Sequence, residues 1–123
     1  MLAEAKGAIQ RAAALTGEKH VLVLYKTSAL CRFMGGTVGI LCKSGKDRTG
    51  MGTTLELTRV LVESFGAIDG PDICSVLRTY GVRRMNVFAN TGQSMFAFNG
   101  LQRSLLPTCY RPPAGTFCSK VDS

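Results

Sequence analysis

The sequence predicts an α/β fold with a strand, a tight loop and a helix at its core, flanked by further helices. Two observations support this prediction. A short apolar run at 37–41 leads into small, polar and basic residues at 42–50. Apolar positions at helical spacing then follow over 50–65, as expected for an amphipathic helix. The loop therefore lies between a strand and a helix N-terminus, with the thiol of Cys42 at its mouth.

In the N-terminal part, apolar spacing predicts a helix, a strand and a helical turn. Residues 2–16 are Ala-rich with apolar side chains on one face, and Thr16-Gly17-Glu18 predicts the end of that helix. The apolar run 21–25 predicts a short strand, and 28–36 predicts a helical turn that ends at two glycines. The central strand is then expected over 37–42.

Turn and capping residues organise the C-terminal half. Asp69-Gly70-Pro71-Asp72 predicts a turn and an N-cap, from which a helix continues over 73–80. Another helix is expected over 96–106, because Pro107 stops it. Residues 107–123 carry Pro and Gly and are expected to run extended over the surface.

The composition is that of a globular protein with an anionic partner. Of 123 residues, 46% are hydrophobic and 19% are charged, which suits a single globular domain. The net charge of +7 favours a lipid surface, an inositol phosphate or a nucleic acid. We do not expect nucleic acid, because the sequence has no zinc finger, basic helix or RNA-binding sheet signature.

The residue types of the loop suit a phosphate and a reactive thiol. Backbone N–H groups at a helix N-terminus bind anions, and the same field lowers the pKa of a cysteine from about 8.5 to about 3.5–7.5. Cys42 would then attack phosphorus as a thiolate. Arg48 offers a planar pair of donors to phosphoryl oxygens, and Thr49 can hydrogen-bond the sulfur. Gly45 lets the backbone bend close to the ligand.

Other interpretations of the loop fit its residues less well. A Gly-x4-Gly-Lys-Ser/Thr nucleotide loop fails, because Ile40 stands at the first Gly position and Asp47 follows Lys46. An inert core cysteine would not require Arg, Thr and two Gly at these offsets. A loop that binds phosphate without turning it over stays an alternative.

The eight residues Cys42-Lys43-Ser44-Gly45-Lys46-Asp47-Arg48-Thr49 resemble the Cys-x5-Arg-Ser/Thr signature of cysteine-based phosphatases. Within that class, the loop more closely resembles those of the inositol polyphosphate 4-phosphatases and of the related bacterial inositol-phosphate phosphatase effectors. Further matches to the 4-phosphatases extend the resemblance over about Val38 to Phe117, at Arg83–Asn86, Asn90–Gly92, Phe96–Asn99, Leu101–Gln102 and Tyr110–Pro113. One departure is Leu41, where many tyrosine phosphatases have His.

The resemblance implies a cysteine-phosphatase-like core. Residues 1–123 would be the C-terminal portion or the core of a phosphoinositide phosphatase catalytic domain, and a partial domain, since only two strands are predicted. In the family, a long N-terminal part with a lipid-binding module precedes the loop. We therefore expect the chain to come from a larger protein.

Asp47 is the best available acid for the leaving group, since ester cleavage needs a proton for the departing oxygen. It is similar to the Asp that directly precedes the loop arginine in myotubularin-like and Sac-like phosphoinositide phosphatases, where that Asp is a proposed general acid. The alternative is that Asp47 only pairs with Arg48 or a lysine and holds the loop in shape.

Basic residues around the loop indicate the substrate. Lys43 and Lys46 are expected to bind the additional phosphates of an inositol ring, the alternative being two solvated lysines. The backbone amides of the loop, including Ser44 and Gly45, would cradle phosphoryl oxygens. Arg83 and Arg84 are candidates for an outer rim of the binding site, unless they only solubilise the surface.

No metal or cofactor is expected, because the five cysteines contain no Cys-x2-Cys pair and the chain has one histidine. An odd number of cysteines fits a reducing compartment. No secretory pattern and no apolar stretch of about 20 residues occur. We expect a cytoplasmic protein with transient contact to a membrane surface.

The sequence therefore predicts a cysteine-dependent phosphatase. The resemblance implies removal of a ring phosphate through a cysteinyl-phosphate, most of all the 4-phosphate of phosphatidylinositol 3,4-bisphosphate. The substrate would be a phosphoinositide lipid or a soluble inositol polyphosphate. Two alternatives stay open: a dual-specificity or tyrosine protein phosphatase, and a non-catalytic phosphoinositide-binding module.

Overall fold

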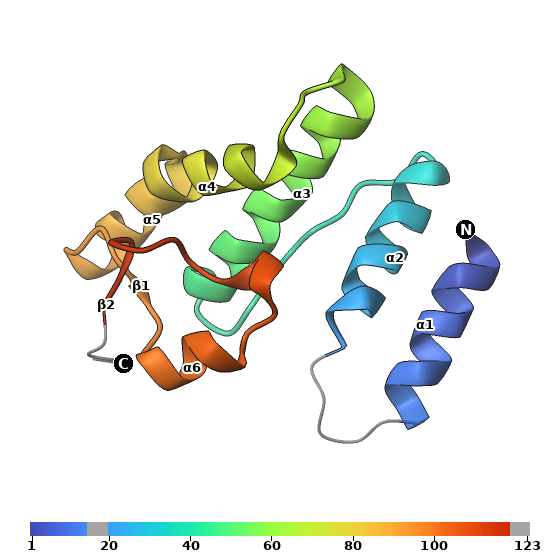
Figure 1. Ribbon diagram of the computed structural model, residues 1–123, viewed down its shortest axis with the longest axis horizontal. Coiled ribbons are helices and arrows are strands. Elements are labelled where there is room, and N and C mark those ends of the chain that lie inside the picture. The colour runs from blue at the N-terminus through green and yellow to red at the C-terminus, as the bar shows by residue number, and fades with distance from the viewer. Residues whose placement is uncertain (15–19, 119–123) are drawn as a thin grey trace. The chain divides into compact units, whose positions relative to one another are not determined.

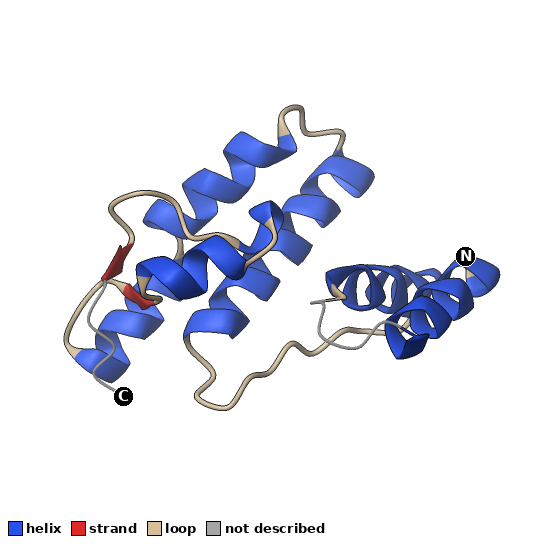
Figure 2. Ribbon diagram, turned by 60° about the horizontal axis from the view of Figure 1, so that its bottom comes forward, coloured by secondary structure: helices blue, strands red, loops and turns tan. Residues whose placement is uncertain are grey.

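The computed structural model describes residues 1–14 and 20–118. Most of them are helical, and two short strands form the sheet of the described part (Figures 1 and 2). The chain divides into two compact units, Met1–Gly39 and Ile40–Ser123. None of the helices in the described part is both long and apolar enough to cross a membrane.

The first unit is a pair of packed helices, α1 (Leu2–Ala14) and α2 (Val21–Phe33). Small side chains let the two backbones approach each other, since the buried residues are Ala5, Ala8 and Ser28. The helix predicted over 2–16 is confirmed as far as Ala14. Its predicted end at Thr16-Gly17-Glu18 lies outside the described residues.

The strand predicted over 21–25 is wrong, because these residues begin α2. A short apolar run fits a strand or a buried helical segment equally well when it is taken alone. Here the helix continues to Phe33, and Lys26 reaches back to form an ion pair with Glu4 of α1 at 3.5 Å. The helical turn predicted over 28–36 belongs to α2 as far as Phe33, where the helix ends.

The second unit is built around α3 (Asp47–Phe65), which packs against α4 (Gly70–Tyr80), α5 (Val82–Thr91) and the short helix η1 (Thr108–Tyr110). The predicted loop helix is confirmed and begins three residues earlier, at Asp47. The capped helix predicted after Asp69 is confirmed as well, because the Asp69 carboxylate accepts a hydrogen bond from the N–H of Asp72.

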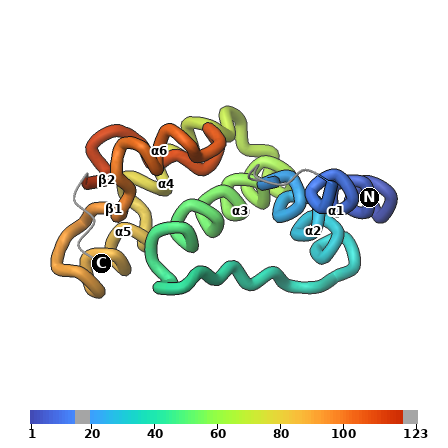
Figure 3. Tube along the Cα trace, turned by 90° about the horizontal axis from the view of Figure 1, so that it is seen from below, coloured from blue at the N-terminus to red at the C-terminus, as the bar shows by residue number. Residues whose placement is uncertain are grey.

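The C-terminal part of this unit contains two short paired strands. β1 (Phe96–Ala97) and β2 (Phe117–Cys118) run parallel, with Phe96 opposite Phe117, and lie side by side in Figure 3. Between them in sequence, α6 (Gly100–Leu105) is capped by the side chain of Asn99. The helix predicted over 96–106 therefore starts too early, because its first two residues pair with β2.

The central strand predicted over 37–42 is wrong, and the α/β phosphatase core is accordingly not confirmed. Residues 37–42 are irregular and precede α3 without joining a sheet. A strand needs a neighbour for its N–H and C=O groups, and the described strands pair with each other instead. The prediction that 107–123 runs extended over the surface is also wrong in part, since 108–110 form η1 and both Pro112 and Thr116 are buried. The end of that range, 119–123, lies outside the described part.

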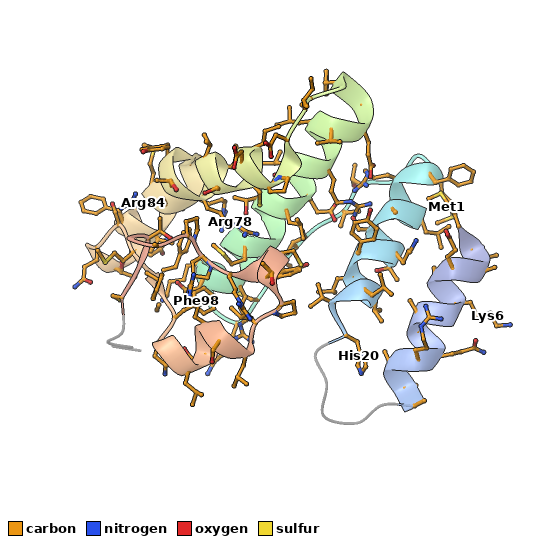
Figure 4. All side chains as sticks on the ribbon, viewed as in Figure 1. Met1, Lys6, His20, Arg78, Arg84 and Phe98 are labelled. Carbon is orange, nitrogen blue, oxygen red and sulfur yellow. The ribbon has the colours of Figure 1, made fainter. Side chains whose placement is uncertain are left out.

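The hydrophobic core of the second unit lies against the start of α3. Met51 is buried there together with Val87, Phe96 and Phe98, the last of which Figure 4 labels. A Cβ atom at Gly50 would meet Cε1 of Phe96 at 2.9 Å, so only glycine lets β1 approach α3 this closely. The core therefore holds β1 against the first turn of α3 and so against the loop that precedes it.

Buried Arg78 joins α4 to α3 and to the C-terminal segment (Figure 4). Its guanidinium donates from Nε to Oγ1 of Thr54 at 3.0 Å and from Nη2 to the carbonyl of Met51 at 3.0 Å, both on α3. It also donates to the carbonyls of Cys109 at 2.7 Å and Arg111 at 3.0 Å. Burial lowers the pKa of Arg78, and these four bonds replace the water that the cation gives up.

Candidate active site

The loop before α3 closes around the sulfur of Cys42. The hydroxyl of Thr49, which is buried in the first turn of α3, donates a hydrogen bond to this sulfur at 3.0 Å. The backbone N–H groups of Ser44, Gly45 and Thr49 also lower the pKa of Cys42, and the Gly45 N–H donates to the Cys42 carbonyl at 3.2 Å. Gly45 has a φ of 68°, a left-handed conformation that only glycine adopts without strain. The loop is thus wound so that several donors meet at one atom.

These donors make Cys42 acidic. Burial of the sulfur raises its pKa, but the hydrogen bonds from the Thr49 hydroxyl and from the N–H groups of Thr49, Gly45 and Ser44 outweigh this effect. Together they lower the pKa of Cys42 from 9.0 to about 7. A substantial share of the molecules then carries a thiolate at neutral pH, as in reactive cysteines.

Thr49→Val should raise the pKa of Cys42, because valine has nearly the same shape but cannot donate to the sulfur. A hydrogen bond to a charged acceptor is worth about 1.5 kcal/mol or more, so the thiolate fraction of Cys42 at pH 7, and with it the alkylation rate, should fall roughly sevenfold. The measurement is the rate of iodoacetamide alkylation as a function of pH, read by mass spectrometry at Cys42. An unchanged pH profile would show that the hydroxyl does not stabilise the thiolate.

A second glycine of α3 sets the path of the segment that carries Cys42. A Cβ atom at Gly52 would lie 2.9 Å from Cγ2 of Ile40, so Ile40 packs directly on the helix backbone. Cys42 follows two residues later and is half-buried. The position of Cys42 is therefore set by an irregular segment that packs on α3, and not by the central strand that was predicted.

Asp47 is held at both of its carboxylate oxygens. Oδ1 accepts a hydrogen bond from the backbone N–H of Ala97 in β1 at 2.8 Å. Oδ2 forms an ion pair with Nζ of Lys46 at 2.9 Å, and both side chains are largely buried. This arrangement ties the start of α3, and with it the loop, to β1.

Two predicted phosphate ligands are exposed. Arg48 lies in the first turn of α3, and Lys43 directly follows Cys42. Neither side chain makes a hydrogen bond or an ion pair with another residue of the described ranges, and both side chains reach solvent. Their charges are therefore available to an anion, whereas that of Lys46 is shared with Asp47.

Of the two predicted rim arginines, the structure brings one to the loop. Nη2 of Arg83 donates to the carbonyl of Gly45 at 2.6 Å. Arg84, which Figure 4 labels, donates instead to carbonyls outside the loop, those of Ser94 at 2.7 Å and Thr79 at 2.8 Å.

Sequence reasoning missed the backbone groups that hold the loop. Asp47 binds the N–H of Ala97, and Arg83 binds the carbonyl of Gly45. Every residue type except proline carries both backbone groups, so no sequence motif predicts these two contacts. Arg78 was missed too, although it lies four residues after buried Cys74 on the face of α4 that packs on α3. No cluster of three or more His, Cys, Asp or Glu side chains suited to a metal ion occurs in the described ranges.

The family described as the INPP4A C-terminal domain matches residues 4–110. The chain belongs to the inositol polyphosphate 4-phosphatase family. The resemblance inferred from the loop is thereby confirmed.

The similar members of this family are far longer than the chain. The type II inositol 3,4-bisphosphate 4-phosphatase of Rattus norvegicus is 37% identical over 107 residues, which are 85% of this chain and 11% of that protein. The inositol polyphosphate 4-phosphatase type II of Homo sapiens and the type II inositol 3,4-bisphosphate 4-phosphatase of Pongo abelii are each 36% identical over 107 residues. The chain spans 12% of the length of each. No solved structure matches the chain significantly.

Proposed function

We propose that the Cys42 loop hydrolyses a phosphate ester of a phosphoinositide or an inositol polyphosphate, most of all the 4-phosphate of phosphatidylinositol 3,4-bisphosphate. The observation that carries this proposal is the hydrogen bond from the Thr49 hydroxyl to the Cys42 sulfur at the start of α3, together with the lowered pKa of Cys42. Two of the relatives are named inositol 3,4-bisphosphate 4-phosphatase and one is named inositol polyphosphate 4-phosphatase, which supports the substrate class. On this proposal, residues 1–123 contribute the core of a phosphatase catalytic domain.

In the first step, the Cys42 thiolate attacks phosphorus. A sulfur–phosphorus bond forms, the bond from phosphorus to the ring oxygen breaks, and that oxygen takes a proton from Asp47. The Arg48 guanidinium and the loop N–H groups bind the phosphoryl oxygens while the charge moves.

In the second step, water attacks the cysteinyl-phosphate. The sulfur–phosphorus bond breaks, the thiolate returns to the hydrogen bond from Thr49, and Asp47 recovers its proton from the water. The products are the alcohol of the ring and inorganic phosphate, and the mechanism uses no metal ion. With its positive charge, the protein would act in the cytoplasm at the surface of a membrane that contains the lipid.

A phosphate-release panel tests this proposal. We expect release from a bisphosphorylated inositol lipid or its soluble headgroup, and little from a phosphotyrosine peptide. The panel covers every phosphoinositide isomer, with chelator present. Release from the peptide alone would identify a protein phosphatase instead. Binding of the lipids without release from any of them would identify a non-catalytic binding module.

Lys43→Met should distinguish an inositol phosphate substrate from one with a single phosphate. The exposed Lys43 charge is available to a second ring phosphate, and such a charge-assisted bond is worth about 1.5–3 kcal/mol. The kcat/KM for a bisphosphate should therefore fall about tenfold or more, while that for an aryl phosphate should change less.

The same change at Lys46 serves as the comparison. Lys46→Met should also lower kcat/KM for the bisphosphate by about tenfold, but it frees Asp47 from its ion pair, so effects on both substrates are expected. Equal losses on the two substrates for Lys43→Met would remove the main physical argument for a bisphosphate. Titration of the loss with salt adds a check, because exposed charges are screened.

A further inference from the structure

Arg83 reaches the phosphate-binding loop from another helix. It lies in the first turn of α5, and its Nη2 donates to the carbonyl of Gly45 at 2.6 Å. Nε of Arg83 is buried and has no hydrogen-bond partner within the described part of the chain. The Arg83 guanidinium is therefore partly buried, and its hydrogen bond goes to one backbone carbonyl of the loop.

The carbonyl that Arg83 holds belongs to the peptide unit between Gly45 and Lys46. The described chain has no cis peptide bond, so the N–H of Lys46 points opposite to this carbonyl. That N–H makes no hydrogen bond to any other described residue. By contrast, the preceding amide, of Gly45, is already used, because it donates to the carbonyl of Cys42 at 3.2 Å. By holding this carbonyl, Arg83 also fixes the direction of the Lys46 N–H, which is the unused donor of the same peptide unit.

We propose that Arg83 is a positioning residue, which turns the Gly45–Lys46 peptide so that the Lys46 N–H meets an oxygen of the transferring phosphoryl group. The inference rests on the proposed function and assigns a different role from that of a rim arginine. A rim arginine would touch the additional phosphates of the substrate. A positioning arginine acts on the reacting phosphate, which every substrate has.

This role predicts equal effects on all substrates. Arg83→Met should lower kcat/KM by about tenfold for a bisphosphate and for an aryl phosphate alike. Removing an oxyanion donor altogether lowers kcat by about 10²–10³, and in this variant the Lys46 N–H is still present but wrongly oriented. Arg83→Lys, which keeps a charged donor, should recover most of the activity. Lys6→Met, at an exposed position of α1, removes the same charge and should leave both rates unchanged.

Amide spectra of the 123-residue chain test the geometry without turnover. Inorganic phosphate added to the ¹⁵N-labelled protein should shift the Lys46 amide resonance, and Arg83→Met should reduce this shift and weaken phosphate binding about tenfold. The alkylation profile of Cys42 should stay the same, because its donors come from Ser44, Gly45 and Thr49. A moved profile together with a lower melting temperature, in both Arg83 variants, would overturn the inference in favour of general loop support.

Other outcomes separate this inference from the proposed function. A loss for Arg83→Met on the bisphosphate alone would overturn it, because Arg83 would then contact the substrate. An unshifted Lys46 amide in the parent protein would overturn it as well. If the parent turns over substrate and Arg83→Met does so equally well, the inference fails and the proposed function stands. If the parent hydrolyses nothing but binds phosphate in an Arg83-dependent way, the inference stands and the proposed function fails.

Discussion

Cys42→Ser is expected to abolish phosphate release while the protein still binds the inositol headgroup. A serine hydroxyl is neutral at pH 7 and a poor nucleophile, whereas Cys42 has a pKa of about 7. The donors on the sulfur come from Thr49 and the loop backbone, which the substitution leaves in place. Release is measured on the bisphosphate lipid, and affinity is measured by calorimetry with its soluble headgroup.

A second thiol of the chain provides the control. The thiol of Cys31 donates to the carbonyl of Thr37 in the first unit, so Cys31→Ser should keep full activity. Rapid quenching of the parent protein should trap a phosphorylated Cys42, detected by mass spectrometry. Full activity of Cys42→Ser would end the cysteine mechanism.

Asp47→Asn is expected to slow hydrolysis of an alkyl phosphate, such as an inositol ring phosphate, by about 10²–10⁴ if Asp47 is the acid. Asparagine keeps an oxygen that can accept the hydrogen bond from the N–H of Ala97, so the tie between the loop and β1 is retained. It loses the proton and the ion pair with Lys46. The measurement is single-turnover release from the two substrates described next.

The leaving group separates the two roles of Asp47. An aryl phosphate with a good leaving group needs little protonation and should lose much less activity than the inositol phosphate. Equal losses on both substrates, with a lower melting temperature, would assign Asp47 to loop structure instead. The observed contacts make that comparison necessary, because both carboxylate oxygens are already engaged.

Helices were predictable where local signals are strong. The apolar spacing after the loop predicts α3, and the Asp69 cap followed by Pro71 predicts α4, because both signals act within one or two helical turns. Strands were not predictable in the same way. Residues 21–25 are as apolar as a strand and yet begin α2, since pairing partners rather than local composition decide between the two.

The sequence by itself determined the chemistry of the loop. Cys42, Thr49 and Gly45 act over a few residues, so their spacing is enough to predict a hydrogen-bonded thiol beside a helix N-terminus and to indicate the family. Only the tertiary structure decided what holds that loop. The contacts of Asp47 with Ala97 and of Arg83 with Gly45 join residues that lie 50 and 38 positions apart in the sequence. In both contacts the partner is a backbone group, and almost every residue carries a similar one. Which backbone group lies within reach therefore depends on how the helices and strands pack.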